Sequence, residues 1–253
     1  MPTRIYATLR NQLGSIRRVY LRGNRIVRRD DFARFDETVL LLHGFFQTRN
    51  IWEVMEDRLR HDGYGVLSFD LGGLFWSLNT RSISDLAEMI SHKMEGLCAR
   101  HNLDRVHVIG HSKGGLIART YIQKFGGDRR VKSLITLGTP HHGTPTALIG
   151  LGLMGGGLIS RSPYEMMPGS PLLRLLKQDT FPAVIPMTSV YSKTDLVCPW
   201  WFSQLHPRPG ESSMQNRIVK GIGHSQLTSH AGVYHVVKAE LDRASELWRE
   251  RST

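Results

Sequence analysis

Residues 106–119 read VHVIGHSKGGLIAR and place a serine, Ser112, between a predicted strand and a predicted helix. The segment 106–109, with three β-branched apolar residues, is typical of a strand, and residues 114–125 have a helical pattern. In the G-x-S-x-G motif between them, glycines flank the serine, because a sharp strand–turn–helix has strained backbone dihedrals that favour small residues. The hydroxyl of Ser112 would then stand at the carboxyl end of the strand, beside the positive end of a helix.

Strand-like and helix-like segments alternate on both sides of this motif. Strands are indicated by a continuous apolar run at residues 38–42 and by strand-like segments at 66–69, 131–137, 184–191 and 216–219. Helical patterns occur at residues 51–60, at 84–100 with Ser84 as the expected N-cap, and at 231–249. This alternation predicts an α/β fold, with a mostly parallel sheet and helices on both faces. We expect one such domain over residues 38–253, because a chain of 253 residues with 40% hydrophobic content can form one substantial core.

The alternation is interrupted between the strands predicted at 131–137 and 184–191. Residues 143–160 contain no charged residue, and a second apolar piece follows at 164–176. Six glycines and Pro145 in the first piece argue against a membrane span, because glycine disfavours an unsupported helix. We therefore predict a lid or cap insertion at about residues 144–180 over an apolar pocket. The alternative is that both pieces belong to the ordinary core.

A serine hydroxyl becomes a good nucleophile at neutral pH only when a base removes its proton and an acid orients that base. Of the twelve histidines, His224 directly follows the last predicted strand of the sheet, where its loop can reach Ser112. Asp195 follows the preceding strand, whereas its nearest rival, Asp179, lies in the predicted insertion. We therefore predict a catalytic set of Ser112, Asp195 and His224.

An acyl-transfer reaction at Ser112 also needs donors for the negative oxygen of its tetrahedral intermediate. One is expected to be the backbone N–H of Lys113, and the other that of Phe45, in the loop after the first predicted strand. The Lys113 side chain is a cation at the start of a helix, which is slightly unfavourable with the helix dipole. It could point to solvent, or it could favour anionic substrates.

Five segments, in this order, resemble bacterial triacylglycerol lipases and esterases of the α/β-hydrolase superfamily. They are His43-Gly-Phe, residues 110–119, TLGTPHHGT at 136–144, SKTDLV at 192–197, and Gly223-His224. The resemblance spans roughly residues 38–245. It implies an α/β-hydrolase fold with a mobile lid, the roles assigned above, and hydrolysis of acyl esters through an acyl-serine intermediate. It also implies that His141 and His142 have structural roles. The alternative, a metal site, would need a third ligand, and none is near them in the sequence. The resemblance implies no cofactor.

The uncharged insertion favours a lipase that acts on medium- to long-chain acyl esters. An acyltransferase, a thioesterase or a polyester depolymerase would use the same three residues and therefore stays open. A non-catalytic lipid-binding protein with this fold is a further alternative, although the intact Ser112, Asp195 and His224 argue against it.

Residues 1–37 form a basic N-terminal segment with nine of the arginines, in a chain of formal net charge +11. Apolar residues recur there at helical spacing from Ile5 to Tyr20, so a basic amphipathic helix is expected. It could contact an anionic membrane surface, pack on the domain, or stay solvated. No nucleic-acid motif accompanies the charge, so no nucleic-acid partner is expected. No signal peptide or transmembrane span is visible, which weakly favours a cytoplasmic or membrane-peripheral location.

The only two cysteines, Cys98 and Cys198, lie in no metal-like cluster and form no disulfide framework. We expect two free thiols, with a single bridge as the alternative.

Overall fold

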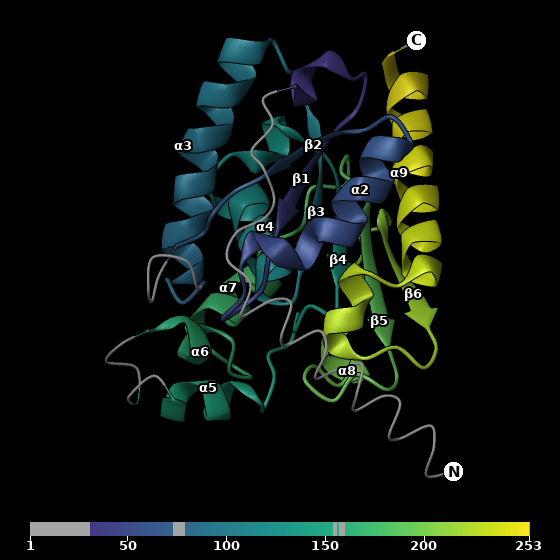
Figure 1. The fold of residues 1–253 in the computed structure, drawn as a ribbon. Helices are drawn as coiled ribbons and strands as arrows, with labels where there is room; N and C mark the ends of the chain where they lie inside the picture. The colour runs from purple at the N-terminus through teal and green to yellow at the C-terminus, as the bar shows by residue number, and fades with distance from the viewer. Residues whose placement is uncertain (1–30, 73–78, 154–155, 157–159, 253) are drawn as a thin grey trace.

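A computed structural model describes residues 31–72, 79–153, 156 and 160–252, and shows one sheet with helices packed around it (Figure 1). The strands are β1 (Thr38–Leu42), β2 (Gly65–Ser68), β3 (Val106–His111), β4 (Val131–Leu137), β5 (Met187–Ser192) and β6 (Met214–Val219). They lie in the order β2-β1-β3-β4-β5-β6, and every pairing is parallel. The predicted α/β fold with a parallel sheet is confirmed.

Two apolar clusters lie on opposite faces of this sheet. The helices α3 (Ile83–His101) and α4 (Lys113–Lys124) cover one face, and α2 (Glu53–His61) and α9 (Ala231–Ser252) cover the other (Figure 1). Within β1, Leu40 and Leu42 belong to the first cluster, and Val39 and Leu41 to the second. Successive side chains of a strand point to opposite faces, so a strand covered on both sides must be apolar throughout.

Some predicted boundaries were wrong, for local reasons. The N-cap of α3 lies two residues earlier than expected: it is Ser82, and not Ser84, and it accepts a hydrogen bond from the Asp85 N–H at 3.3 Å. β5 begins at Met187 and not at residue 184, directly after Pro186, which has no N–H to donate to a neighbouring strand. A short 3₁₀ turn, η2 (Arg49–Trp52), replaces the expected first turn of α2.

Residues 31–37 pack against the sheet. Phe32 is buried against Gly65 of β2, where a Cβ atom would overlap the Phe32 backbone. Glu37 accepts a hydrogen bond from Lys132 Nζ at 2.6 Å and lies 3.2 Å from His107 Nε2. Burial raises the pKa of Glu37, but the hydrogen bonds with His107 and Lys132 outweigh burial and lower it to about 2. The domain boundary at residue 38 stays a prediction, and the amphipathic helix expected at 5–20 lies outside the described residues.

In its described residues, the segment between β4 and β5 contains three α-helices, at the end of the sheet where the strands finish (Figure 1). They are α5 (Ala147–Leu153), α6 (Ser162–Glu165) and α7 (Pro171–Gln178). α7 has Ser170 as its N-cap and buries Leu172, Leu173 and Leu176 in the core. Residues 154–155 and 157–159 of the uncharged stretch lie outside the described residues, and the lid role stays a prediction. Among the described helices, none has the length and apolarity to cross a bilayer.

Cys98 and Cys198 are both buried and free, as expected from their sequence context.

Candidate active site

Ser112 lies in a strained turn between β3 and α4. Its backbone has φ 54° and ψ −124°, a conformation that non-glycine residues rarely adopt. Its N–H donates to the Leu137 carbonyl at 2.9 Å, which ties the turn to the end of β4. A Cβ atom at Gly110 would lie 2.5 Å from the Gly115 Cα, so the strand and the helix can approach this closely only with glycine there. Strain of this kind is typical of functional positions.

Asp195 and His224 form a buried, hydrogen-bonded pair. The His224 Nδ1 atom lies 2.7 Å from Asp195 Oδ2, and Asp195 is 3% exposed. The other carboxylate oxygen, Oδ1, accepts the backbone N–H groups of Val197 and Cys198, each at 2.9 Å. Because both oxygens are engaged, the carboxylate has one orientation, and its bond to Nδ1 leaves Nε2 of His224 as the ring nitrogen able to act on a substrate.

Ser112 and the Asp195–His224 pair meet at the same edge of the sheet. The His111 ring centroid, next to Ser112 in sequence, lies 4.6 Å from that of His224, and His111 Nε2 lies 3.1 Å from the His224 carbonyl. Gly138, directly after β4, also touches the pair, since a Cβ atom there would lie 3.0 Å from Asp195 Oδ2 and 3.1 Å from His224 Nδ1. Among the described residues no hydrogen bond joins the Ser112 hydroxyl to the His224 ring. Such bonds are often long in ligand-free sites.

The loop at residues 43–47, which carries the expected donor Phe45, packs against Ser112. A Cβ atom at Gly44 would lie 2.9 Å from the Ser112 Cβ. Two side chains hold this loop in place: Gln47 Oε1 accepts the Gly44 N–H at 2.8 Å, and Asn79 Nδ2 donates to the His43 carbonyl at 3.0 Å. We did not predict either residue. Gln47 follows Gly44 by three positions and could have been suspected, but no local signal links Asn79 to this loop.

The structure corrects one expectation about Lys113: its side chain does not point to solvent. The side chain is fully buried, and its Nζ atom donates to Asn79 Oδ1 at 2.7 Å and to the Arg81 carbonyl at 2.5 Å. It also lies 5.7 Å from the centre of the Phe45 ring. Burial holds the pKa of the Lys113 ammonium well below its usual range. Lys113 therefore contributes to the site twice, with its backbone beside Ser112 and with a side chain that reaches the loop at 43–47 through Asn79.

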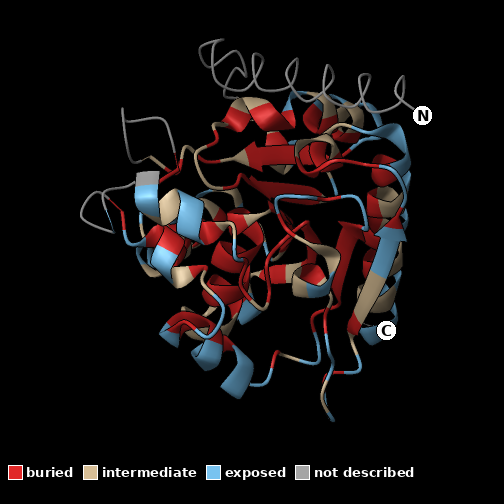
Figure 2. Ribbon diagram, turned by 90° about the horizontal axis from the view of Figure 1, so that it is seen from below, coloured by how far each residue is buried: buried red, intermediate tan, exposed pale blue. Residues whose placement is uncertain are grey.

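Five exposed apolar side chains, which we call the apolar rim, lie on two segments at this end of the molecule. They are Leu148 and Ile149 of α5, and Leu196, Val197 and Trp201. The Thr146 hydroxyl donates to the Val197 carbonyl at 2.7 Å, so the two segments are in contact. Figure 2 views the molecule from this end and shows exposed stretches beside the buried ends of the strands. Since Val197 donates its N–H to Asp195, the apolar rim is adjacent to the candidate catalytic pair.

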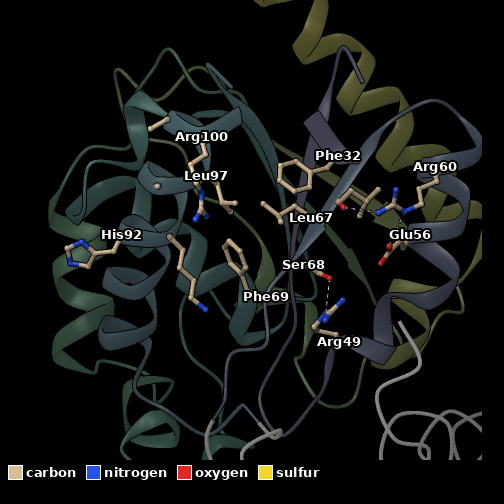
Figure 3. Close-up of a pocket in the computed structure, with 14 residues that line it drawn as sticks. Phe32, Arg49, Glu56, Arg60, Leu67, Ser68, Phe69, His92, Leu97 and Arg100 are labelled. Carbon is tan, nitrogen blue, oxygen red and sulfur yellow. Dashed lines mark hydrogen bonds and ion pairs between the residues drawn. The ribbon is translucent and has the colours of Figure 1, made fainter. Parts of the chain in front are cut away.

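A sizeable cavity in the described part of the chain lies elsewhere. It has a volume of about 690 Å³ and lies between α2 and α3, beside the edge strand β2 (Figure 3). Leu67, Phe69 and Leu97 line it, together with charged side chains such as Arg49 and Glu56, and none of Ser112, Asp195 and His224 does. This cavity is therefore separate from the candidate active site.

Comparison with known proteins agrees with this architecture. Residues 37–153 match the model of a family described as the alpha/beta hydrolase fold. In sequence, the chain is similar to a 2-hydroxy-6-oxononadienedioate/2-hydroxy-6-oxononatrienedioate hydrolase of Pseudomonas putida, at 27% identity over 66% of this chain and 55% of that protein. It is also similar to a probable lysophospholipase of Arabidopsis thaliana, at 30% identity over 42% of this chain and 25% of that protein. The chain thus spans about half or less of the length of these curated relatives.

Solved structures extend the likeness over most of the chain. A lipase from Bacillus licheniformis superposes with a TM-score of 0.64 at 15% identity, over 87% of this chain and 96% of that one. A monoacylglycerol lipase from Paleococcus ferrophilus superposes with a TM-score of 0.59 at 15% identity, over 83% and 94%. At such identities the likeness is one of fold. The chain therefore has the α/β-hydrolase fold, and its match to that family covers strands β1 to β4 and Ser112.

Proposed function

We propose that the protein hydrolyses carboxylic esters through an acyl-serine intermediate, with Ser112 as nucleophile and His224 as its base. The observation that carries this proposal is the 2.7 Å contact between buried Asp195 and His224, at the sheet edge that holds the strained Ser112 turn. A nucleophile beside a base, with that base oriented by a third group, is the arrangement that activates a serine.

In the proposed reaction, His224 takes the proton of the Ser112 hydroxyl as its oxygen attacks the ester carbonyl carbon. The resulting oxyanion accepts hydrogen bonds from the Phe45 and Lys113 N–H groups, neither of which donates to an acceptor among the described residues. His224 then gives its proton to the leaving alcohol, and water repeats the sequence to release the acid. Asp195 keeps the proton on Nδ1 and stabilises the imidazolium that forms.

For the substrate we propose an ester with a medium- to long-chain acyl group. The apolar rim supports this, because exposed apolar side chains beside a buried catalytic pair suit an apolar chain at the entrance. Some proteins with this fold, including the two lipases above, are named for lipid esters.

A series of p-nitrophenyl esters with 2 to about 12 acyl carbons, assayed with wild type and Ser112→Ala, tests both parts. We expect kcat/KM to rise from the two-carbon ester to the medium-chain esters, and Ser112→Ala to lower kcat by roughly 10³-fold or more. A steady fall of activity with chain length would overturn the lipase assignment and leave an esterase. Lack of covalent labelling of wild type by an organophosphonate probe, together with unchanged activity in Ser112→Ala, would overturn the whole proposal.

A further inference from the structure

A second cavity, of about 500 Å³, is lined by none of Ser112, Asp195 and His224, but it shares Trp201 with the apolar rim. Its walls come from α4, α7, the short helix α8 (Trp200–Ser203) and residues 205–214. Four of the side chains that line it are cationic: Arg119, Arg174, Lys177 and Arg208. Apolar side chains, including Leu173 and Phe202, complete the walls. The cavity therefore combines positive charge with an apolar surface.

Arg119 on α4 is a buried cation without a carboxylate partner. It is 8% exposed, and its guanidinium donates to Gln123 Oε1 at 2.8 Å and to the Leu176 carbonyl at 2.9 Å. Both acceptors are neutral, and no ion pair involves Arg119 in the described part of the chain. Burial lowers the pKa of Arg119 to about 10, which reflects how poorly the site solvates the charge. An unpaired buried charge is costly, so an anion beside Arg119 would be strongly favoured.

The one carboxylate that lines the cavity, Glu211, raises the pKa of Arg119 through its charge, but it forms no ion pair with Arg119 and is paired with Arg208 instead. Glu211 Oε1 accepts from Arg208 Nη2 at 2.8 Å and from the Phe181 N–H at 3.0 Å. Its Oε2 accepts from the Arg208 N–H at 3.0 Å and from Arg208 Nε at 3.3 Å. Glu211 therefore offsets the charge of Arg208. Arg174 and Lys177, three residues apart on exposed positions of α7, have no ion-pair partner among the described residues.

His141 adds a buried polar atom without a partner to the wall of the same cavity. The residue is 3% exposed, and its Nε2 lies 3.0 Å from Thr136 Oγ1. Its Nδ1 is buried and has no hydrogen-bond partner. Seven buried side-chain atoms of the described residues lack such a partner, and His141 Nδ1 is the one among them on a residue that lines this cavity.

We propose that this cavity is a binding site for an anionic amphiphile, a molecule with a carboxylate or phosphate head group and a hydrocarbon chain of medium length. The head would lie among Arg119, Arg174 and Lys177, and the apolar body against Leu173 and Phe202. A guanidinium and an ammonium are the side-chain groups that best bind such oxyanions. The site is independent of the chemistry at Ser112, and it takes the same class of molecule as the acid that ester hydrolysis would release.

Titration calorimetry on the full chain tests this site, with octanoate, octyl phosphate and neutral octanol as probes, each below its critical micelle concentration. All three are measured on the Ser112→Ala variant, so that the result does not depend on catalysis. We expect saturable binding of one or both anions at one site, weakened by added salt, and roughly tenfold or more weaker binding of octanol. Comparison of the two anions identifies the head group that the site prefers.

Two variants decide where the anion binds. Arg174→Gln combined with Lys177→Gln changes only exposed side chains of α7, and we expect it to weaken anion binding by roughly tenfold or more with an unchanged Tm. Lys220→Gln, an exposed cation that does not line the cavity, is the matched control and should bind like wild type. Equal binding of octanol and the anions, equal binding by the double variant and the control, or no binding of either anion would overturn the proposal.

Discussion

Lys113→Met removes a buried ammonium that contacts the loop at residues 43–47 through Asn79. In the wild type, Lys113 Nζ donates to Asn79 Oδ1, and Asn79 in turn donates to the His43 carbonyl. Methionine has a similar length but no donor. The substitution therefore tests two roles for the Lys113 side chain. It could position the loop that carries the Phe45 N–H, or it could favour anionic substrates through its charge.

The expected magnitude follows from the contacts that are lost. Asn79 is fully buried, and a buried acceptor left without a donor costs about 1–3 kcal/mol. The Arg81 carbonyl is only partly buried and can turn to water, and removal of a desolvated ammonium offsets part of the cost. We expect a net loss of about 1–2 kcal/mol in the free energy of unfolding. Loosening of one oxyanion donor should lower kcat by about 10- to 100-fold, less than the loss of a donor outright.

The assay is steady-state hydrolysis of one neutral and one anionic medium-chain ester, together with urea unfolding. We expect the same fold-decrease in kcat for both esters, with KM little changed, because the ammonium is already engaged with Asn79 and Arg81. Asn79→Ala should lower kcat in the same way, and the double variant should lose less than the two single losses combined, since both changes break one contact. Lys220→Met is the control for substitution of an exposed lysine. A larger effect on the anionic ester, or an unchanged kcat in a destabilised variant, would refute this reasoning.

Three further predictions concern the candidate catalytic pair, the glycine beside it and the ion pair of Glu37 just before β1. Asp195→Asn should lower kcat by about 10³- to 10⁴-fold with little change in KM, because an amide cannot hold His224 in the required tautomer; an unchanged kcat would exclude Asp195 as the orienting acid. Gly138→Ala should lower kcat and cost about 1 kcal/mol in stability, since its φ is +56° and its Cβ atom would crowd Asp195 and His224; wild-type activity would show that the pair tolerates displacement. Glu37→Gln should lower the free energy of unfolding at pH 7 by about 1–2 kcal/mol, a figure reduced for the partial exposure of the ion pair with Lys132. The Glu37 pKa is lowered from 4.5 to about 2, so its stabilisation is present above pH 4.5 and is lost as the pH falls toward 2; equal acid sensitivity of wild type and variant in urea unfolding would contradict the assignment.

The amino-acid sequence alone predicted the fold class and the position of the strained turn at the candidate nucleophile, Ser112. Both depend on patterns that are local in the chain. A strand covered on both faces is largely apolar along its length, as in β1, and a strand-to-helix turn around Ser112 needs Gly110 beside it. The position of Asp195 and His224 after successive strands could be predicted for the same reason, because the carboxyl ends of parallel strands meet at one edge.

Only the tertiary structure decided what the polar side chains around this edge do. The sequence left open whether Lys113 faces solvent or substrate, yet its ammonium is buried against Asn79, 34 residues away in the chain. Likewise, the sequence pattern of α4 does not reveal that Arg119 is buried. Arg119 has no ion-pair partner among the described residues because Glu211 pairs with Arg208 instead. Hydrogen bonds and ion pairs between distant segments depend on distances that no local pattern encodes. Apolar periodicity therefore predicts the scaffold of this protein, whereas the partners of its buried charges emerge only when the chain is folded.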